Sequence, residues 1–304
     1  MLFYRSLFPL NVIKMRPTGI NVPSVTPFNA KGEIMYDKLG KLLEFWIDGG
    51  ISGVVANAST GEAPYLSNAE RVKIIEYLVE KADGRINIFA GTGAPSLWKS
   101  VEYTKEAKAA GAQAALVTTP YFFKPTSDEI AQYFIDLMDK VDIPVIMYNV
   151  PKFTAYSVSP YVVAKVAEEC SNLVAIKDSS NNPGNMADIV SLCGDKINAL
   201  SGTADMILPA LTLGGKGGIV AIANVAPRTC VNIFDAYNKS DVKTAGANQL
   251  KASWVNKIVV RDYPQIPAIK AALNQMGVDA GVPRKPLTGL SEATAKKIKA
   301  ELRL

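Results

Sequence analysis

A lysine stands at the end of an apolar run in the stretch NLVAIKDSSN, residues 172–181. The run 173–176 predicts a strand buried on both faces, and Lys177 follows it directly. Either this side chain extends to the solvent-exposed rim, or its amine stays partly withdrawn from water and acts as a nucleophile. An amine attacks a carbonyl carbon only in its neutral form, and withdrawal from water disfavours the charged form. Neighbouring polar residues must decide between these readings.

Tyr148 directly follows the preceding apolar run, IPVIM, residues 143–147. Adjacent parallel strands lie about 4.8 Å apart, so a phenol at one strand end can reach an amine at the next. The tyrosine is either a core residue with its hydroxyl bonded to the backbone or a proton-transfer group. The adjacent lysine favours proton transfer.

The stretch STGE, residues 59–62, adds two hydroxyls, those of Ser59 and Thr60, and a glycine, Gly61, that permits close backbone approach. Backbone N–H groups in such a turn can bind a carboxylate. Taken alone, the stretch is also ordinary turn chemistry. Two glycine-rich stretches, AGTGAPS and LGGKGG, match neither the dinucleotide motif nor the phosphate-binding loop, and the second predicts a tight turn before a strand.

Composition excludes several classes of protein. Of the 304 residues, 48% are hydrophobic and 20% are charged, which favours a folded chain with a sizeable core. Histidine is absent, so His-based triads, His-ligated zinc and histidine bases are excluded. The net charge of +5 comes from scattered residues, which argues against nucleic acid as a partner. Three cysteines without a C-x-x-C pair suit a cytoplasmic protein.

The chain alternates short apolar runs with amphipathic ones, and it contains no apolar run long enough to cross a membrane. The pattern predicts an α/β protein, a (β/α)8 barrel with a C-terminal helical extension; a doubly wound sheet is the alternative. We expect an N-terminal extension at 1–14, the barrel at 15–240 and a helical region at 241–304. The predicted strands span 20–25, 53–56, 86–90, 114–118, 145–149, 174–177, 199–201 and 218–222.

Functional groups of such barrels gather where strands end and the following loops begin. Polar segments follow the second, fourth and fifth predicted strands, at residues 57–67, 118–126 and 147–154, and Lys177 ends the sixth. This convergence favours the interpretation of Lys177 as a nucleophile over that of a side chain extending to the solvent-exposed rim. Asp178 should point to the opposite side of its strand.

These segments, in this order, resemble the dihydrodipicolinate synthase / N-acetylneuraminate lyase family of class I, pyruvate-dependent aldolases. The likeness runs from about Ile20 to the C-terminus. It rests on STGE followed by LS-x-x-E, and on TPYFFKP, YNVP, AIKDSS, LSGTAD and GGIVAIANVAP.

The resemblance implies a role for each matching residue. Lys177 would form a Schiff base with a 2-keto acid, Tyr148 would shuttle the proton, and Ser59 would belong to the proton relay. Thr60 with its neighbouring amides would bind the carboxylate, and Gly202 and the carbonyl of Ile219 would line the pocket. An iminium ion is an electron sink, so no metal or organic cofactor is implied. The family also implies a homo-oligomer, a tetramer.

Two positions depart from the dihydrodipicolinate synthase branch. Phe153 stands where that branch has an arginine for the carboxylate of aspartate semialdehyde, although Lys152 beside it is a cation. Phe122 stands where that branch has a tyrosine that completes a neighbouring subunit's relay. Both departures argue against lysine biosynthesis.

We therefore expect a 2-keto-3-deoxygluconate aldolase that releases pyruvate and glyceraldehyde, with Tyr148 as base for the C4 hydroxyl. The loop PYFFKPT, residues 120–126, has no arginine, which disfavours a phosphorylated substrate. Lys124 could still bind a phosphate group as a point charge. The alternatives are 4-hydroxy-tetrahydrodipicolinate (dihydrodipicolinate) synthase and 4-hydroxy-2-oxoglutarate aldolase. A sensor that binds keto acids without turnover is the alternative outside enzymes, and Phe122 favours it.

Overall fold

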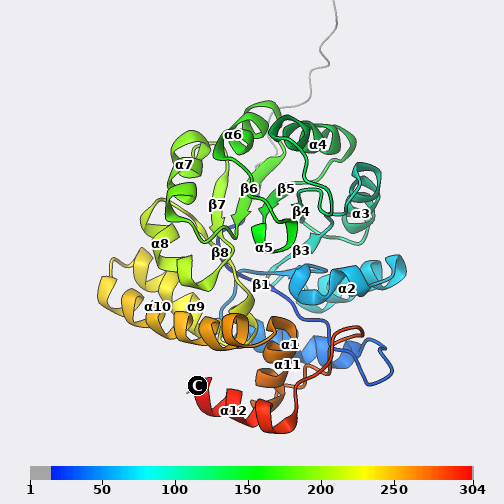
Figure 1. Cartoon of the computed structure of the whole chain (residues 1–304), viewed down its shortest axis with the longest axis vertical. Helices are drawn as coiled ribbons and strands as arrows, with labels where there is room; N and C mark the ends of the chain where they lie inside the picture. Colours follow the sequence, from blue (N-terminus) through cyan, green and yellow to red (C-terminus); the bar gives the residue numbers. More distant parts are fainter. Residues whose placement is uncertain (1–14, 303–304) are drawn as a thin grey trace, which may run out of the picture.

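In the computed structural model, which describes residues 15–302, eight parallel strands pair in chain order and the last pairs with the first. Figure 1 shows this closed barrel with its helices arranged around it. The expected extension at 1–14 lies outside the described residues. The strands are β1 Gly19–Pro23, β2 Gly53–Ala56, β3 Asn87–Gly91, β4 Ala114–Thr118, β5 Val145–Asn149, β6 Leu173–Asp178, β7 Asn198–Ser201 and β8 Gly217–Ile219.

The apolar runs become strands because a closed parallel sheet buries both faces of each strand. The observed bounds agree with the expected ones to within two residues, except at the end of β8. We expected this strand to continue to Ile222, but it ends at Ile219. Its pairing with β1 stops there, and the side-chain amide of Asn224 then donates a hydrogen bond to Pro23 O at 2.9 Å. The chain turns into a 3-10 helix at this point.

Helices follow the strands as expected. Those around the barrel are α1 Tyr36–Asp48, α2 Asn68–Ala82, α3 Leu97–Ala109, α4 Ser127–Lys140, α6 Pro160–Glu169, α7 Pro183–Cys193, α8 Ile207–Thr212 and α9 Pro227–Asn238. Short helical turns in the connecting loops are η1 Ser59–Gly61, η2 Ala63–Tyr65, α5 Pro151–Thr154, η3 Ala204–Met206 and η4 Ala221–Asn224. Within residues 15–302, no helix is both long and apolar enough to cross a membrane.

Local signals in the sequence set the helix ends. Ser67 and Glu70 form the reciprocal capping box at the start of α2, with the Ser67 N–H donating to the Glu70 carboxylate at 2.8 Å. Beyond α2 and α3, Gly84 and Gly111 adopt φ angles of 71° and 93°, which favour glycine. The LGGKGG stretch forms the tight turn into β8, as predicted.

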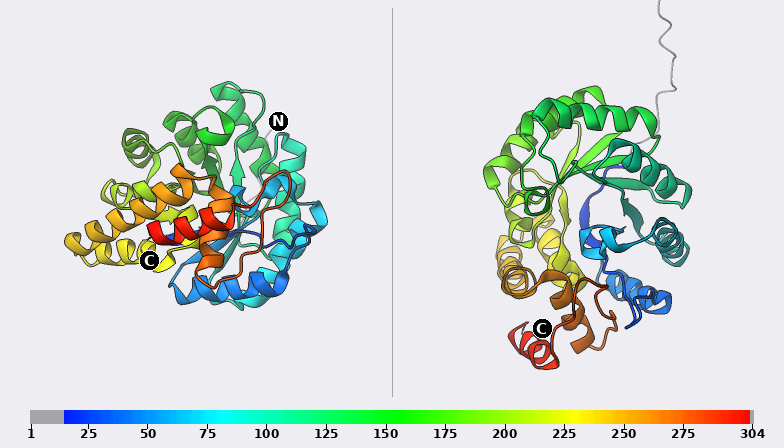
Figure 2. Two further views of the ribbon diagram at one scale, coloured as in Figure 1. Left: turned by 60° about the horizontal axis from the view of Figure 1, so that its bottom comes forward. Right: turned by 45° about the vertical axis from the view of Figure 1, so that its right-hand side comes forward.

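The C-terminal region consists of α10 Val242–Asn256, the π-helical turn η5 Lys257–Asp262, α11 Gln265–Gln275 and α12 Glu292–Leu302. Figures 1 and 2 show α11 and α12 on the side of the barrel formed by α1, α9 and α10. Between α11 and α12, the chain passes close to the loops that follow β1 and β2. Arg284 in this segment binds the Glu70 carboxylate at 2.6 and 2.9 Å, and it also donates to Tyr65 O at 2.7 Å.

This contact predicts a pH dependence of stability. The Arg284 guanidinium holds the pKa of Glu70 at about 2, below its ordinary 4.5. A carboxyl group with a lowered pKa stabilises the folded state above about pH 4.5, and this contribution is lost as the pH falls toward 2. We expect Glu70→Gln to reduce the change in unfolding free energy between pH 5 and pH 2 in urea titrations, since the variant lacks this group. Glu76→Gln, at an exposed position of α2, is the control. An unchanged pH slope in the Glu70 variant would contradict the assignment.

Candidate active site

Lys177 and Tyr148 lie side by side at the carboxyl ends of β6 and β5, where the barrel register pairs them. Their exposed fractions are only 3% and 5%. The Nζ atom of Lys177 lies 4.1 Å from the centroid of the Tyr148 ring. Beneath them, apolar side chains fill the barrel interior, including Val55, Phe89, Leu116, Ile146, Val174 and Leu200. The strand therefore delivers the amine to a buried place and not to the rim.

No ion pair within residues 15–302 includes Lys177. The neighbouring carboxylate, Asp178, accepts hydrogen bonds from Asn149 Nδ2 at 2.6 Å, Ser180 Oγ at 2.7 Å and Asn185 Nδ2 at 3.1 Å. Successive residues of a strand face opposite sides, so these partners hold Asp178 away from the lysine. A buried amine beside a phenol and without a carboxylate partner is the arrangement expected of an amine nucleophile.

The STGE stretch forms the turn η1 directly after β2, with Thr60 buried and Ser59 half-buried. The N–H groups of Gly61 and Glu62 donate to Ala58 O and Ser59 O within the turn. This leaves the N–H groups of Ser59 and Thr60 without a partner inside the turn. A Cβ on Gly61 would lie 2.9 Å from Ser24 O, so the glycine allows the turn to approach the end of β1.

The ends of β7 and β8 bring two further candidates to this end of the barrel. Gly202 follows β7, and its N–H donates to Asp178 O at 2.7 Å. A Cβ there would collide with the Ser179 hydroxyl and lie 3.0 Å from that same oxygen, so glycine allows this close contact beside Lys177. Ile219, the last residue of β8, is fully buried and pairs with Asn21 of β1.

The two phenylalanines that depart from the synthase pattern lie farther out. Phe122, in the loop before α4, is 89% exposed and packs edge-on against Phe123. Phe153, on α5, is 53% exposed. Next to it, Lys152 Nζ lies 3.3 Å from the side-chain oxygen of Gln265 in α11. The same Gln265 side chain donates to Thr60 Oγ1 at 3.5 Å, so the C-terminal region reaches the turn that follows β2.

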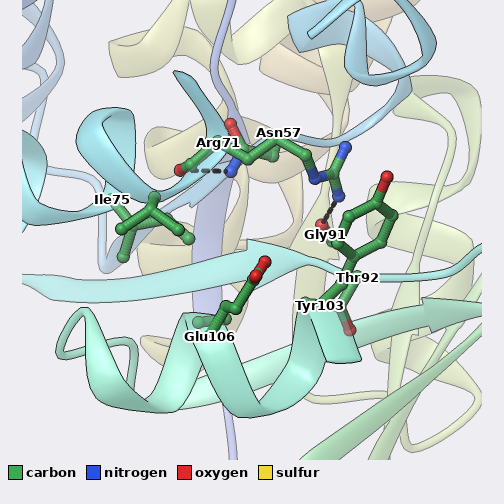
Figure 3. Close-up of a pocket in the computed structure, with 9 residues that line it drawn as sticks. Asn57, Arg71, Ile75, Gly91, Thr92, Tyr103 and Glu106 are labelled. Atoms are coloured by element: carbon green, nitrogen blue, oxygen red, sulfur yellow. Dashed lines mark hydrogen bonds between the residues drawn. The ribbon is translucent and has the colours of Figure 1, made fainter. Parts of the chain in front are cut away.

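A separate small cavity lies outside the barrel wall, between the ends of β2 and β3 and the helices α2 and α3 (Figure 3). The buried Arg71 side chain crosses it and donates to Gly91 O at 2.6 Å, and the Tyr103 ring stacks on its guanidinium. The space suffices for about one water molecule, so it is too small for a keto acid.

Three residues of this region were not foreseen from the sequence: Glu62, Gln265 and Lys270. Lys270 of α11 is buried and forms an ion pair with Glu62 at 2.6 Å. Burial lowers the pKa of Lys270 to about 8 against the opposing effect of Glu62, so the amine is mostly protonated at neutral pH. The run IPAIKAAL could have indicated a buried lysine, because Lys270 lies among apolar residues there. Lys177 likewise follows an apolar run.

The sequence profile of the Dihydrodipicolinate synthetase family matches residues 16–304. The chain belongs to this family. It is 38% identical to the 4-hydroxy-tetrahydrodipicolinate synthase of Thermodesulfovibrio yellowstonii, covering 94% of this chain and 97% of the relative. It is 34% identical to the synthase of the same name from Methanococcus maripaludis, covering 93% and 97%. The crystal structure of dihydrodipicolinate synthase from Aquifex aeolicus superposes with a TM-score of 0.89 at 35% identity, covering 94% and 97%.

Membership in the dihydrodipicolinate synthetase family confirms the fold and the reaction class. The chain is a class I, pyruvate-dependent lyase with a TIM barrel, and the family's reaction uses a covalent Schiff base on a lysine without an external cofactor. We expected cleavage of a sugar acid, with condensation of pyruvate and aspartate semialdehyde as an alternative. The names of these relatives support the condensation better than the cleavage.

Proposed function

We propose that this chain cleaves 2-keto-3-deoxygluconate-type sugar acids through a Schiff base on Lys177, releasing pyruvate and glyceraldehyde. The observation that carries the Schiff-base centre is the buried Lys177 amine, 4.1 Å from the Tyr148 ring and outside every ion pair of residues 15–302. We infer the aldehyde product from position 153, where a half-exposed phenyl group stands in place of the arginine expected of the synthase branch.

The chemistry divides among the residues at the strand ends. Lys177 attacks the keto carbon and water leaves, and the resulting iminium ion accepts the electron pair when the C3–C4 bond breaks. Glyceraldehyde departs, the remaining enamine takes up a proton at C3, and water hydrolyses the imine to release pyruvate and the free Lys177 amine. Tyr148 removes the proton of the C4 hydroxyl, with Ser59 in the relay. The N–H groups and the hydroxyl at Thr60 bind the substrate carboxylate beside Gly61, and Gly202 and the Ile219 carbonyl border the imine.

Condensation of pyruvate with aspartate semialdehyde is the second candidate. The names of the curated relatives favour it, and Lys152 places an ammonium group near Gln265 and Thr60. An ammonium is a point charge, whereas arginine binds a carboxylate through two parallel hydrogen bonds. Lys152 is also exposed, so water weakens its attraction for a second carboxylate.

A comparison of substrates on one protein preparation distinguishes the sugar-acid aldolase from the synthase, from a 4-hydroxy-2-oxoglutarate aldolase and from a sensor. Pyruvate release from 2-keto-3-deoxygluconate is measured beside the consumption of pyruvate with aspartate semialdehyde and with glyoxylate, the aldehyde from which 4-hydroxy-2-oxoglutarate forms. We expect the highest kcat/KM with the sugar acid. A higher value for aspartate semialdehyde would reject the proposed substrate and leave the Schiff-base centre intact. No turnover of any substrate, with pyruvate still bound, would indicate a sensor.

Phe153→Arg tests the rim directly. The new guanidinium stands at the half-exposed position beside Lys152, where it can form two hydrogen bonds with a carboxylate. We expect kcat/KM for aspartate semialdehyde to rise about tenfold, the effect of one additional charge-assisted contact. Phe153→Leu is the control without charge. An equal rise in both variants would show that size, and not charge, limits this substrate.

We also propose a cytoplasmic homo-oligomer, a tetramer. Trp98, Phe122 and Phe123 are 68%, 89% and 80% exposed, and large apolar side chains of this exposure favour burial between subunits. The three cysteines, all within the described residues, are free and buried, as suits a reducing compartment. Sedimentation of the purified chain at the monomer position would contradict the assembly.

A further inference from the structure

Lys270 is a second lysine withdrawn from water, and its surroundings differ from those of Lys177. All three of its donors are used within hydrogen-bond distance: Glu62 Oε1 at 2.6 Å, Thr26 O at 2.6 Å and Val282 O at 2.8 Å. The Phe28 ring lies 4.7 Å from its Nζ. The side chain joins three parts of the chain: the start of the loop between β1 and α1, the turn after β2 and the segment after α11.

The partner of Lys270, Glu62, is the last residue of the STGE stretch. It adopts the left-handed conformation, with φ 61° and ψ 35°, which is unfavourable for a residue with a Cβ. Such a conformation persists where the surroundings hold it in place. Its side chain is fully buried, and its second carboxylate oxygen accepts a hydrogen bond from the backbone N–H of Arg284 at 2.8 Å.

Lys270 is also connected to the turn through Thr26. The Thr26 hydroxyl donates to Gly61 O at 2.8 Å, while the Thr26 carbonyl accepts from Lys270. The carbonyl of Gly61 and the side chain of Glu62 are thus both anchored through Lys270. The N–H groups of Ser59 and Thr60 lie at the start of this short turn, so its conformation sets their direction.

We propose that Lys270 is a positioning residue for the reaction: it holds the turn of residues 59–62 in the conformation that receives the carboxylate of the keto acid. The inference rests on the proposed function, since it needs Thr60 and its neighbours to bind that carboxylate. It assigns to the C-terminal helical region, from which Lys270 comes, a part in substrate binding.

The test compares pyruvate with acetone, which has a keto carbon and no carboxylate. Each is trapped on Lys177 by borohydride, and peptide mass spectrometry gives the occupancy of Lys177 against ligand concentration. We expect Lys270→Met/Glu62→Gln to raise the half-saturating pyruvate concentration about ten- to a hundredfold, as for the loss of one charge-assisted contact. Acetone labelling should stay within about twofold, because it needs no contact with the turn.

The double variant leaves no unpaired buried carboxylate, which a Lys270→Met variant alone would, and circular dichroism confirms that it is folded. Lys38→Met is the matched control: Lys38 pairs with Asp279 at 3.0 Å in the same C-terminal segment but is partly exposed and is not hydrogen-bonded to the turn. Unchanged pyruvate half-saturation in the double variant, or equal losses for pyruvate and acetone, would overturn the proposal. Absence of a pyruvate adduct in the unmodified protein would instead reject the Schiff-base function.

Discussion

Lys177→Ala is expected to abolish aldol cleavage. The variant has no amine at the end of β6, so the substrate carbon chain loses its electron sink and the C3–C4 bond stays intact. We expect kcat to fall by about 10⁴-fold or more, the scale on which enzymes lose activity with their nucleophile. Pyruvate release, followed with a coupled dehydrogenase, measures this directly.

The matched control for that variant is Lys152→Ala, which removes an exposed lysine from the rim and leaves the buried amine in place. We expect the control to keep kcat within about threefold, since an exposed ammonium interacts weakly with its surroundings. Comparable losses in both variants would mean that the rim lysine takes part in the reaction, and the assignment of the nucleophile would need revision.

Tyr148→Phe is expected to cause the second-largest loss. The phenyl ring keeps the packing against Lys177, where the ring centroid lies 4.1 Å from Nζ, and only the hydroxyl is removed. Loss of a general acid–base group costs about 10²- to 10⁴-fold in kcat. Because the amine is retained, imine formation should still be detected by borohydride trapping, although more slowly.

The experiment pairs single-turnover cleavage with trapping on the same variant. Tyr156→Phe is the control, because Tyr156 is another buried tyrosine, and its hydroxyl donates to the Pro120 carbonyl instead of facing the amine. Full activity in Tyr148→Phe would show that another group moves the proton.

Much of the fold could be predicted because short stretches of the sequence determine where strands and helices begin and end. The apolar runs at β2, β4 and β5 give the strand bounds without error, since strands buried on both faces need continuous apolar residues. The capping box at Ser67 is equally local. The end of β8 was missed because the Asn224 amide, which binds Pro23 O, depends on a contact between the two ends of the barrel sequence.

Part of the candidate site could also be predicted from the sequence, and part could not. Lys177 and Tyr148 could be placed together because the ends of neighbouring parallel strands meet. The connection of Glu62 to Lys270 could not, because it joins residues 208 positions apart and depends on how α11 packs over the loops. Both buried lysines lie in or directly after an apolar run of the sequence. Only the structure distinguishes them, because Lys270 forms an ion pair with Glu62 and Lys177 is in no ion pair of residues 15–302.

Borohydride reduction in the presence of pyruvate, followed by peptide mass spectrometry, tests the central claim most directly. We expect one reduced pyruvate per chain, covalently attached to Lys177 and absent when either pyruvate or borohydride is left out. A chain that stays unmodified under these conditions, or that carries the adduct on another lysine, would contradict Lys177 as the Schiff-base residue.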